Sequence, residues 1–185
     1  KDRPIASGQV SVKTALVLSA VLCLFAFAIL IQFNQKTIIL GLASMPFAFS
    51  YPLMKRFTYW PQLFLGFTFN YGLIMAWVSL NDNFSLYPII FYLGAIFWTL
   101  GYDTIYGFQD IKDDEIIGVK STSIKFKKNP KIFIFLCYFF FYLSLILVGL
   151  LMAFSKFYFI FSLILLLQLF FFQVYSLYVD KPEVC

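Results

Sequence analysis

The residues best suited to chemistry form an acidic cluster in the middle of the chain. Asp103, Asp110, Asp113, Asp114 and Glu115 all lie in the segment DTIYGFQDIKDDE. An α-helix turns by about 100° per residue, so one unbroken helix would place Asp110 and Asp114 within about 20° of the direction of Asp103. Asp110 and Asp114 would then lie about 6 Å apart along the axis. The spacing predicts a stripe of three carboxylates that can bind one cationic group.

Oxygen-only ligands of this kind suit Mg²⁺, which keeps several waters and bridges carboxylates to substrate phosphates. The chain has no histidine, which argues against a zinc or di-iron centre. Asp103 lies deeper in apolar sequence than Asp110, and ionisable groups inside a membrane span usually face a cavity or a partner. Two alternatives remain open, because the stripe could be a solvated helix end and Gly107 could break the helix.

A second polar cluster is the segment SYPLMKRFTYWPQ, in which Lys55 and Arg56 follow Tyr51 by about one helical turn. Two cations at the end of a span often serve only to fix topology. If they lie opposite the carboxylates, however, a metal ion and these cations would hold a diphosphate between them. The segments KDRPIASG and GVKST add Arg3 and Lys120 as further cations.

The elements that position these residues are apolar and long. The chain of 185 residues is 62% hydrophobic and 12% charged, whereas soluble domains contain about 25% charged residues. A helix that crosses a bilayer needs about 20 apolar residues and must satisfy its own backbone hydrogen bonds. We therefore predict an all-α, polytopic membrane helix bundle with six spans. The six runs without a charged residue are 14–35, 37–54, 57–81, 83–102, 132–155 and 157–179.

The distribution of basic residues gives the orientation. Six spans place every lysine and arginine except Lys36 and Lys156 on one side, which the positive-inside rule assigns to the cytoplasm or the matrix. The positive net charge of +5 is therefore a topology signal. A nucleic-acid-binding protein would instead show a basic stripe on a soluble fold, so we expect a lipid bilayer and no nucleic acid as partner.

Several motifs together point to a known family. DTIYGFQDIKDD resembles the second aspartate-rich motif of the UbiA superfamily of intramembrane aromatic prenyltransferases. SYPLMKRFTYWPQLFLG is similar to a signature of its 4-hydroxybenzoate polyprenyltransferase branch. KDRPIASGQVS and GVKSTSI are similar to the stretches that follow the two aspartate-rich motifs. The resemblance implies a nine-helix bundle, with residues 1–185 as a single membrane-embedded prenyltransferase domain truncated at both ends, lacking the first aspartate-rich motif and the last helix.

The resemblance also implies a reaction. It is the Mg²⁺-dependent transfer of a polyprenyl group from polyprenyl diphosphate to 4-hydroxybenzoate, in ubiquinone biosynthesis at a bacterial or mitochondrial inner membrane. Asp110 and Asp114 would bind Mg²⁺, and Lys55 would bind the diphosphate, with Arg3 and Lys120 as further candidates.

Other roles under the resemblance concern the aromatic acceptor and the allylic cation. Asp103 would hold the acceptor's phenol or support the metal ligands, and Arg56 would pair with the acceptor's carboxylate or with the diphosphate. Tyr51 would line the cation's path, as would Tyr71, Tyr102 and Tyr106, because aromatic faces attract cations. Three alternatives stay open: another aromatic acceptor, a transporter whose carboxylates relay ions, and a scaffold without catalysis.

Overall fold

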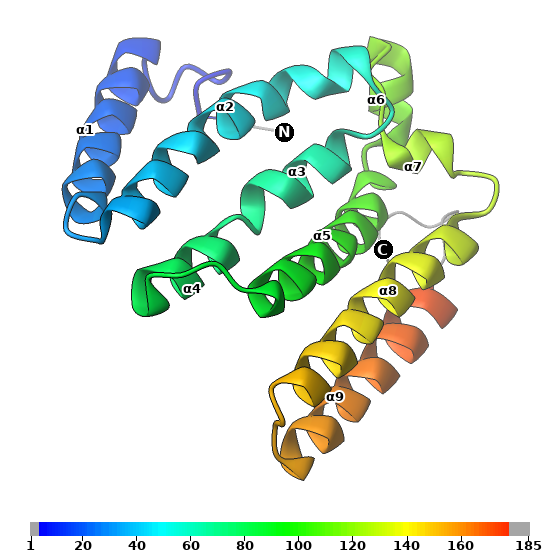
Figure 1. Ribbon diagram of the computed structural model, residues 1–185. Coiled ribbons are helices and arrows are strands. Elements are labelled where there is room, and N and C mark those ends of the chain that lie inside the picture. Colours follow the sequence, from blue (N-terminus) through cyan, green and yellow to red (C-terminus); the bar gives the residue numbers. More distant parts are fainter. Residues whose placement is uncertain (1–3, 178–185) are drawn as a thin grey trace.

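The computed structural model describes residues 4–177, and every regular element in this part of the chain is a helix (Figure 1). Serine or asparagine side chains cap several of them, because such side chains accept hydrogen bonds from the free N–H groups of a first turn. Asn34, for example, accepts from the Thr37 amide at 2.9 Å. The elements are α1 (Val12–Leu30), α2 (Gln35–Phe57), α3 (Pro61–Phe69), α4 (Gly72–Asn81), α5 (Leu86–Gly107), α6 (Ile111–Ile117), α7 (Thr122–Lys125), α8 (Pro130–Leu151), α9 (Lys156–Gln168) and the π-helix η1 (Leu169–Tyr175).

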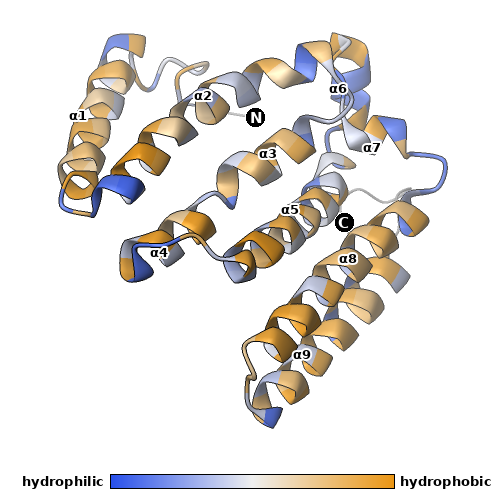
Figure 2. Ribbon diagram, viewed as in Figure 1, coloured by the Kyte–Doolittle hydropathy of each residue, from blue (hydrophilic) through white to orange (hydrophobic). Residues whose placement is uncertain are grey.

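Within residues 4–177, six segments are long and apolar enough to cross a membrane, which confirms the predicted number of spans. Four of them are the single helices α1, α2, α5 and α8, while α3 with α4 and α9 with η1 form the other two. Apolar residues dominate along these helices, and hydrophilic residues gather at their ends and in α6 (Figure 2). The chain is therefore a polytopic, all-α membrane bundle.

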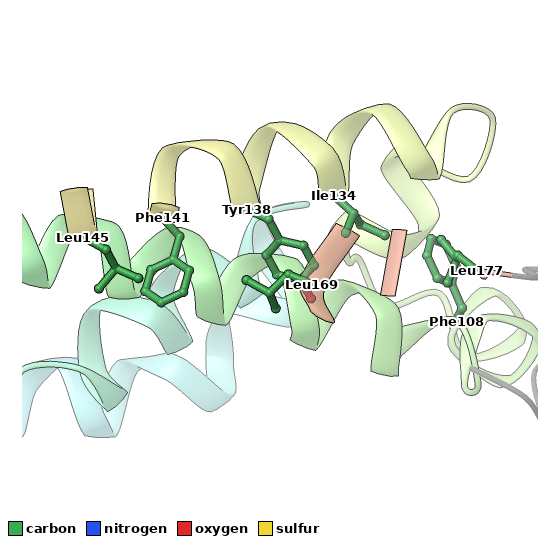
Figure 3. Close-up of a cluster of buried hydrophobic side chains, with 7 residues drawn as sticks. All are labelled: Phe108, Ile134, Tyr138, Phe141, Leu145, Leu169 and Leu177. Atoms are coloured by element: carbon green, nitrogen blue, oxygen red, sulfur yellow. The ribbon is translucent and has the colours of Figure 1, made fainter. Parts of the chain in front are cut away.

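Helix α5 is the central element, packed against α3 on one side and most extensively against α8 on the other. Close packing depends on small residues, as is common between membrane helices. A Cβ atom on Gly101 would lie only 2.6 Å from the ring of Tyr138. The buried cluster between α5, α8 and η1 comprises Phe108, Ile134, Tyr138, Phe141, Leu145, Leu169 and Leu177 (Figure 3).

The third span differs from a single helix, because it is interrupted at Asn70 and Tyr71. The buried Asn70 amide donates to the carbonyl of Gly66 at 2.9 Å and to the hydroxyl of Thr99 on α5 at 2.7 Å. A side-chain amide that bonds backbone locally competes with helix continuation. The bond to Thr99 fixes this interruption against α5.

The alternative that Gly107 breaks the helix between Asp103 and Asp114 is correct, so the stripe of three carboxylates on one helix does not form. Helix α5 ends at Gly107, and α6 begins only at Ile111. Gly107 packs so tightly that a Cβ atom would lie 2.3 Å from the Ser123 hydroxyl. Phe108 then turns into the core with 1% of its surface exposed. The chain therefore changes direction between Asp103 and the other two carboxylates.

Candidate active site

The last turns of α2 carry three of the predicted site residues. Tyr51 and Lys55 are four residues apart, so they lie on the same face of the helix. Arg56 is exposed and forms no ion pair with any acidic residue in the part of the chain that the structure describes. The predicted group of cations is therefore divided, with Lys55 directed to the site and Arg56 at its edge.

Helix α6, which begins just after Asp110 and carries Asp114, lies beside the end of α2 (Figure 1). Asp110 is its N-cap residue, and the Asp114 amide donates to the Asp110 carbonyl at 2.9 Å. Lys55 Nζ lies 3.7 Å from Asp114 Oδ2, and the Asp114 side chain is only 13% exposed. The structure thus joins two motifs that are about sixty residues apart in the sequence.

Asp103 lies on α5, one turn before this helix ends at Gly107. Lys55 is close enough to act electrostatically on its half-buried carboxylate, and Tyr51 and Tyr102 lie within range of the same carboxylate. Lys55 therefore pairs with Asp114 on α6 and acts electrostatically on Asp103 on α5. The arrangement replaces the predicted stripe along one helix.

Lys120 is also at this end of the bundle, where it stabilises the end of α2. Its amide donates to the Lys55 carbonyl at 2.8 Å, and its ammonium donates to the Phe57 carbonyl at 3.4 Å. The ammonium also lies 5.5 Å from the centre of the Tyr59 ring. Arg3, the other predicted cation, lies outside the described residues.

A buried polar network, which the sequence motifs did not indicate, holds α7 in place. Thr104 on α5 and Thr122 on α7 share a hydrogen bond between their hydroxyls at 2.6 Å. The Ser123 hydroxyl donates to the Thr104 carbonyl at 2.8 Å, and Gln62 on α3 accepts from the Thr122 amide at 3.0 Å. The run of hydroxyl residues Ser121–Ser123 directly after Lys120 was the available signal, because fully buried hydroxyls must find partners.

Aromatic side chains continue from the charged end toward the middle of the bundle. The Tyr71 ring lies 6.2 Å from Phe47 and 6.3 Å from Tyr92, and Tyr102 lies 4.8 Å from Trp98. A pocket of about 550 Å³ adjoins Trp98, Asn70 and Phe141. Tyr102 and Tyr106 line a second pocket of about 290 Å³ nearer the charged end. Apolar space with aromatic walls thus lies along α5, although Lys55, Asp103 and Asp114 line neither pocket.

This end of the bundle offers a metal ion a pair of carboxylates, without a larger group of ligands in the described residues. Within residues 4–177, no group of three or more histidine, cysteine, aspartate or glutamate side chains is arranged to hold an ion. Asp110 and Asp114 are neighbours one turn apart on α6, which is a pair of hard oxygen donors. Such a pair fits Mg²⁺ bound through one or two carboxylates and completed by water and phosphate.

Comparison with known proteins decides the family. The model of the UbiA prenyltransferase family matches residues 1–185. The chain belongs to the UbiA prenyltransferase family. A UbiA homolog from Aeropyrum pernix K1 has the same fold, with a TM-score of 0.80 and 21% identity over 98% of this chain and 73% of that one. At this identity the likeness shows the fold alone.

Family relatives of higher identity carry more specific names. The chain is 43% identical over 133 residues to 4-hydroxybenzoate polyprenyltransferase, mitochondrial, of Drosophila melanogaster, and 46% identical over 132 residues to that of Caenorhabditis elegans. It is 43% identical over 137 residues to 4-hydroxybenzoate geranyltransferase 2 of Lithospermum erythrorhizon. Each match covers 71 or 72% of this chain but only 34, 37 and 44% of the respective relative. The chain thus spans less than half the length of these relatives.

Proposed function

We propose that the protein transfers a polyprenyl group from polyprenyl diphosphate to 4-hydroxybenzoate, as a step of ubiquinone biosynthesis. The observation that carries the proposal is the contact between Lys55 on α2 and Asp114 on α6. This contact gathers a cation and carboxylates at one end of the helices. Family membership favours prenyl transfer over ion transport or a scaffold role.

The diphosphate of the donor is the group that this charged end would bind. Lys55 would place its ammonium on the diphosphate, with Lys120 and Arg3 as additional cations. Asp110 and Asp114 would hold Mg²⁺, which when bound supplies positive charge that stabilises the departing diphosphate. Fixed charges of this kind stabilise a transition state because they need little rearrangement as charge develops.

Cleavage of the bond between the prenyl carbon and the diphosphate oxygen leaves an allylic cation. Tyr51 and Tyr102 lie near Asp103, and their rings would stabilise that cation by about 0.5–2 kcal/mol each. The ring carbon ortho to the acceptor's hydroxyl then forms the new carbon–carbon bond, and the ring loses that carbon's proton. Asp103 would orient the acceptor's phenol or support the metal ligands.

An assay of the full-length protein tests the proposal. We expect labelled 4-hydroxybenzoate and a polyprenyl diphosphate to give prenylated product with Mg²⁺, and EDTA to abolish product formation until Mg²⁺ is restored. Product formed equally well in EDTA would remove the role of the metal. Prenylation of another aromatic acid, with none of 4-hydroxybenzoate, would overturn the acceptor.

Arg56 has two candidate partners, and the KM values of an Arg56 variant would distinguish them. The R56A variant should raise the KM for 4-hydroxybenzoate if the guanidinium pairs with the acceptor's carboxylate, and the KM for the diphosphate if it serves the donor. Its exposure at the edge of the site is consistent with either substrate arriving there. Unchanged values of both KM and kcat would take Arg56 out of the site.

We also propose that the end of the bundle with α6 and α7 faces the cytoplasm or the mitochondrial matrix. The lysines and arginines gather at this end, as the positive-inside rule requires. Labelling of single cysteines introduced at Lys112 and Lys156 in intact and opened vesicles would test this orientation. The two positions should react from opposite sides of the membrane.

A further inference from the structure

Asn70 places a polar side chain in the middle of the apolar third span, where α3 ends and α4 begins. The residue is buried, with 8% of its surface exposed. Its amide nitrogen donates to the Gly66 carbonyl at 2.9 Å, the Ala95 carbonyl at 3.2 Å and the Thr99 hydroxyl at 2.7 Å. Backbone carbonyls only accept hydrogen bonds, so the nitrogen must face them and Oδ1 must point elsewhere.

The Oδ1 atom of Asn70 has no hydrogen-bond partner within residues 4–177. It is not sealed inside the protein, because Thr37 Oγ1 is the one fully enclosed side-chain oxygen or nitrogen without a partner in this part of the chain. Asn70 lines the pocket of about 550 Å³ that adjoins Trp98 and Phe141. Its Oδ1 therefore offers this pocket a hydrogen-bond acceptor, held in place by the bonds of the amide nitrogen.

The remaining wall of the pocket indicates the chemistry of its ligand. Aromatic rings of Phe69, Phe91, Trp98 and Phe141 line it, and the other lining residues apart from Asn70 are glycine, alanine and leucine. Such a wall suits an aromatic ring. A buried acceptor without a donor is unfavourable, so a ligand that brings a donor is preferred over a prenyl chain, which has none.

This acceptor lies close to the candidate active site in the direction of the span. Thr99, to which Asn70 is bonded, precedes Asp103 on α5 by one turn, or about 6 Å along the axis. The Trp98 ring lies 4.8 Å from Tyr102, which is within electrostatic range of Asp103. An aromatic acid whose hydroxyl met Asn70 would direct its carboxylate toward the charged end of the helices.

We propose that Asn70 is a specificity-determining residue whose Oδ1 accepts a hydrogen bond from the phenol hydroxyl of the aromatic acceptor. This inference rests on the proposed function, because it names the group that recognises the hydroxyl of 4-hydroxybenzoate. It assigns the phenol to Asn70, and Asp103 then keeps the role of supporting the metal ligands.

A pair of ligands tests this assignment on the full-length protein. Displacement of labelled 4-hydroxybenzoate gives the affinities of 4-hydroxybenzoate and of 4-fluorobenzoate, which has a similar size but no hydrogen-bond donor. The wild type should prefer the hydroxyl compound by about 10- to 100-fold, because the fluoro compound leaves a buried acceptor unpaired. N70L should reduce the preference to less than about twofold, while D103A should keep it. A preference unchanged in N70L, or lost in D103A alone, would overturn the proposal.

T99V is the matched control, because it removes one bond of the Asn70 amide nitrogen and leaves Oδ1 in place. It should keep both the ligand preference and the KM for 4-hydroxybenzoate, even where it lowers the unfolding temperature. N70L should raise the KM for 4-hydroxybenzoate and leave the KM for polyprenyl diphosphate unchanged. Equal increases of both KM values in N70L would show a structural role alone and contradict the proposal.

A structure of the wild-type, full-length protein with 4-hydroxybenzoate tests the same contact without any variant. The phenol oxygen should lie within about 3.2 Å of Asn70 Oδ1. A water bound to Oδ1, with the phenol at Asp103, would overturn the proposal. Failure of the proposed function is a distinct result, because a wild type that does not prenylate 4-hydroxybenzoate removes the acceptor itself. Normal prenylation together with an unchanged preference in N70L removes only the role of Asn70.

Discussion

Two lysine–aspartate ion pairs lie at opposite ends of the helices, and they differ in burial more than in distance. Lys36 Nζ lies 3.4 Å from Asp82 Oδ1, and Lys55 Nζ lies 3.7 Å from Asp114 Oδ2. The Asp82 side chain is 66% exposed, whereas that of Asp114 is 13% exposed. The closer pair is therefore the more hydrated one, and distance alone does not separate an anchoring pair from a site.

The surroundings explain the difference. Asp82 ends α4 in a short connection. Lys36 makes two contacts with this one residue, because its ammonium pairs with the Asp82 carboxylate and also donates to the Asp82 backbone carbonyl at 2.5 Å. Lys55 instead lies among several carboxylates, with Asp103 on α5 and Asp110 next to Asp114 on α6. Lys36 thus meets one acidic residue at its end, whereas Lys55 meets carboxylates from two different helices.

The largest difference between the two ends should appear on replacing the aspartates. In the full-length protein, D114N should lower kcat for prenyl transfer by roughly 100- to 1000-fold, the usual loss when one electrostatic stabiliser of the transition state is removed. D82N, at the opposite end, should leave kcat within about twofold, because an exposed pair contributes little. Steady-state kinetics at saturating Mg²⁺ measures both. Similar losses in the two variants would contradict the assignment of the site to α2 and α6.

Replacing the lysines should give a smaller but parallel contrast. K55Q should raise the KM for polyprenyl diphosphate and lower kcat/KM by about 100-fold, since a buried phosphate loses a charged hydrogen bond worth roughly 1.5–3 kcal/mol and its charge complement. K36Q should keep the KM of the wild type. K55R should recover part of the loss, because arginine also binds phosphate. Full turnover in K55Q would assign Lys55 to helix anchoring alone.

The sequence was sufficient for the spans because each one is a long apolar run bounded by charges. It was also sufficient to link Lys55 with Asp114, since alternation of six spans brings both motifs to one end. It left the break at Gly107 as an open alternative and did not indicate the interruption at Asn70, because both helices stop there for reasons of tertiary packing. Ser123 packs closely against Gly107, and the Thr99 hydroxyl accepts a hydrogen bond from the Asn70 side-chain amide. Neither contact can be predicted from the spacing of residues in the sequence.

The network that holds α7 should contribute to stability by an intermediate amount. T122V removes the hydroxyl bonded to Thr104 and leaves that buried hydroxyl with one partner fewer, which should lower the free energy of unfolding by about 1–3 kcal/mol. T68V is the control, because the Thr68 hydroxyl donates only to Phe64 within its own helix. Thermal unfolding in detergent compares the two. A larger decrease in unfolding temperature for T68V than for T122V would show that the network does not fix α7.

The smallest effect should come from the exposed pair itself. A double-mutant cycle with K36A, D82A and the combined variant should give a coupling energy of about 0.2–1 kcal/mol, because water and salt screen an exposed pair. The coupling should shrink further at high salt, since the Debye length falls to about 3 Å at 1 M. A coupling above about 2 kcal/mol would mean that this end is as strongly organised as the one that carries Asp114. The contrast in burial would then no longer distinguish the two ends.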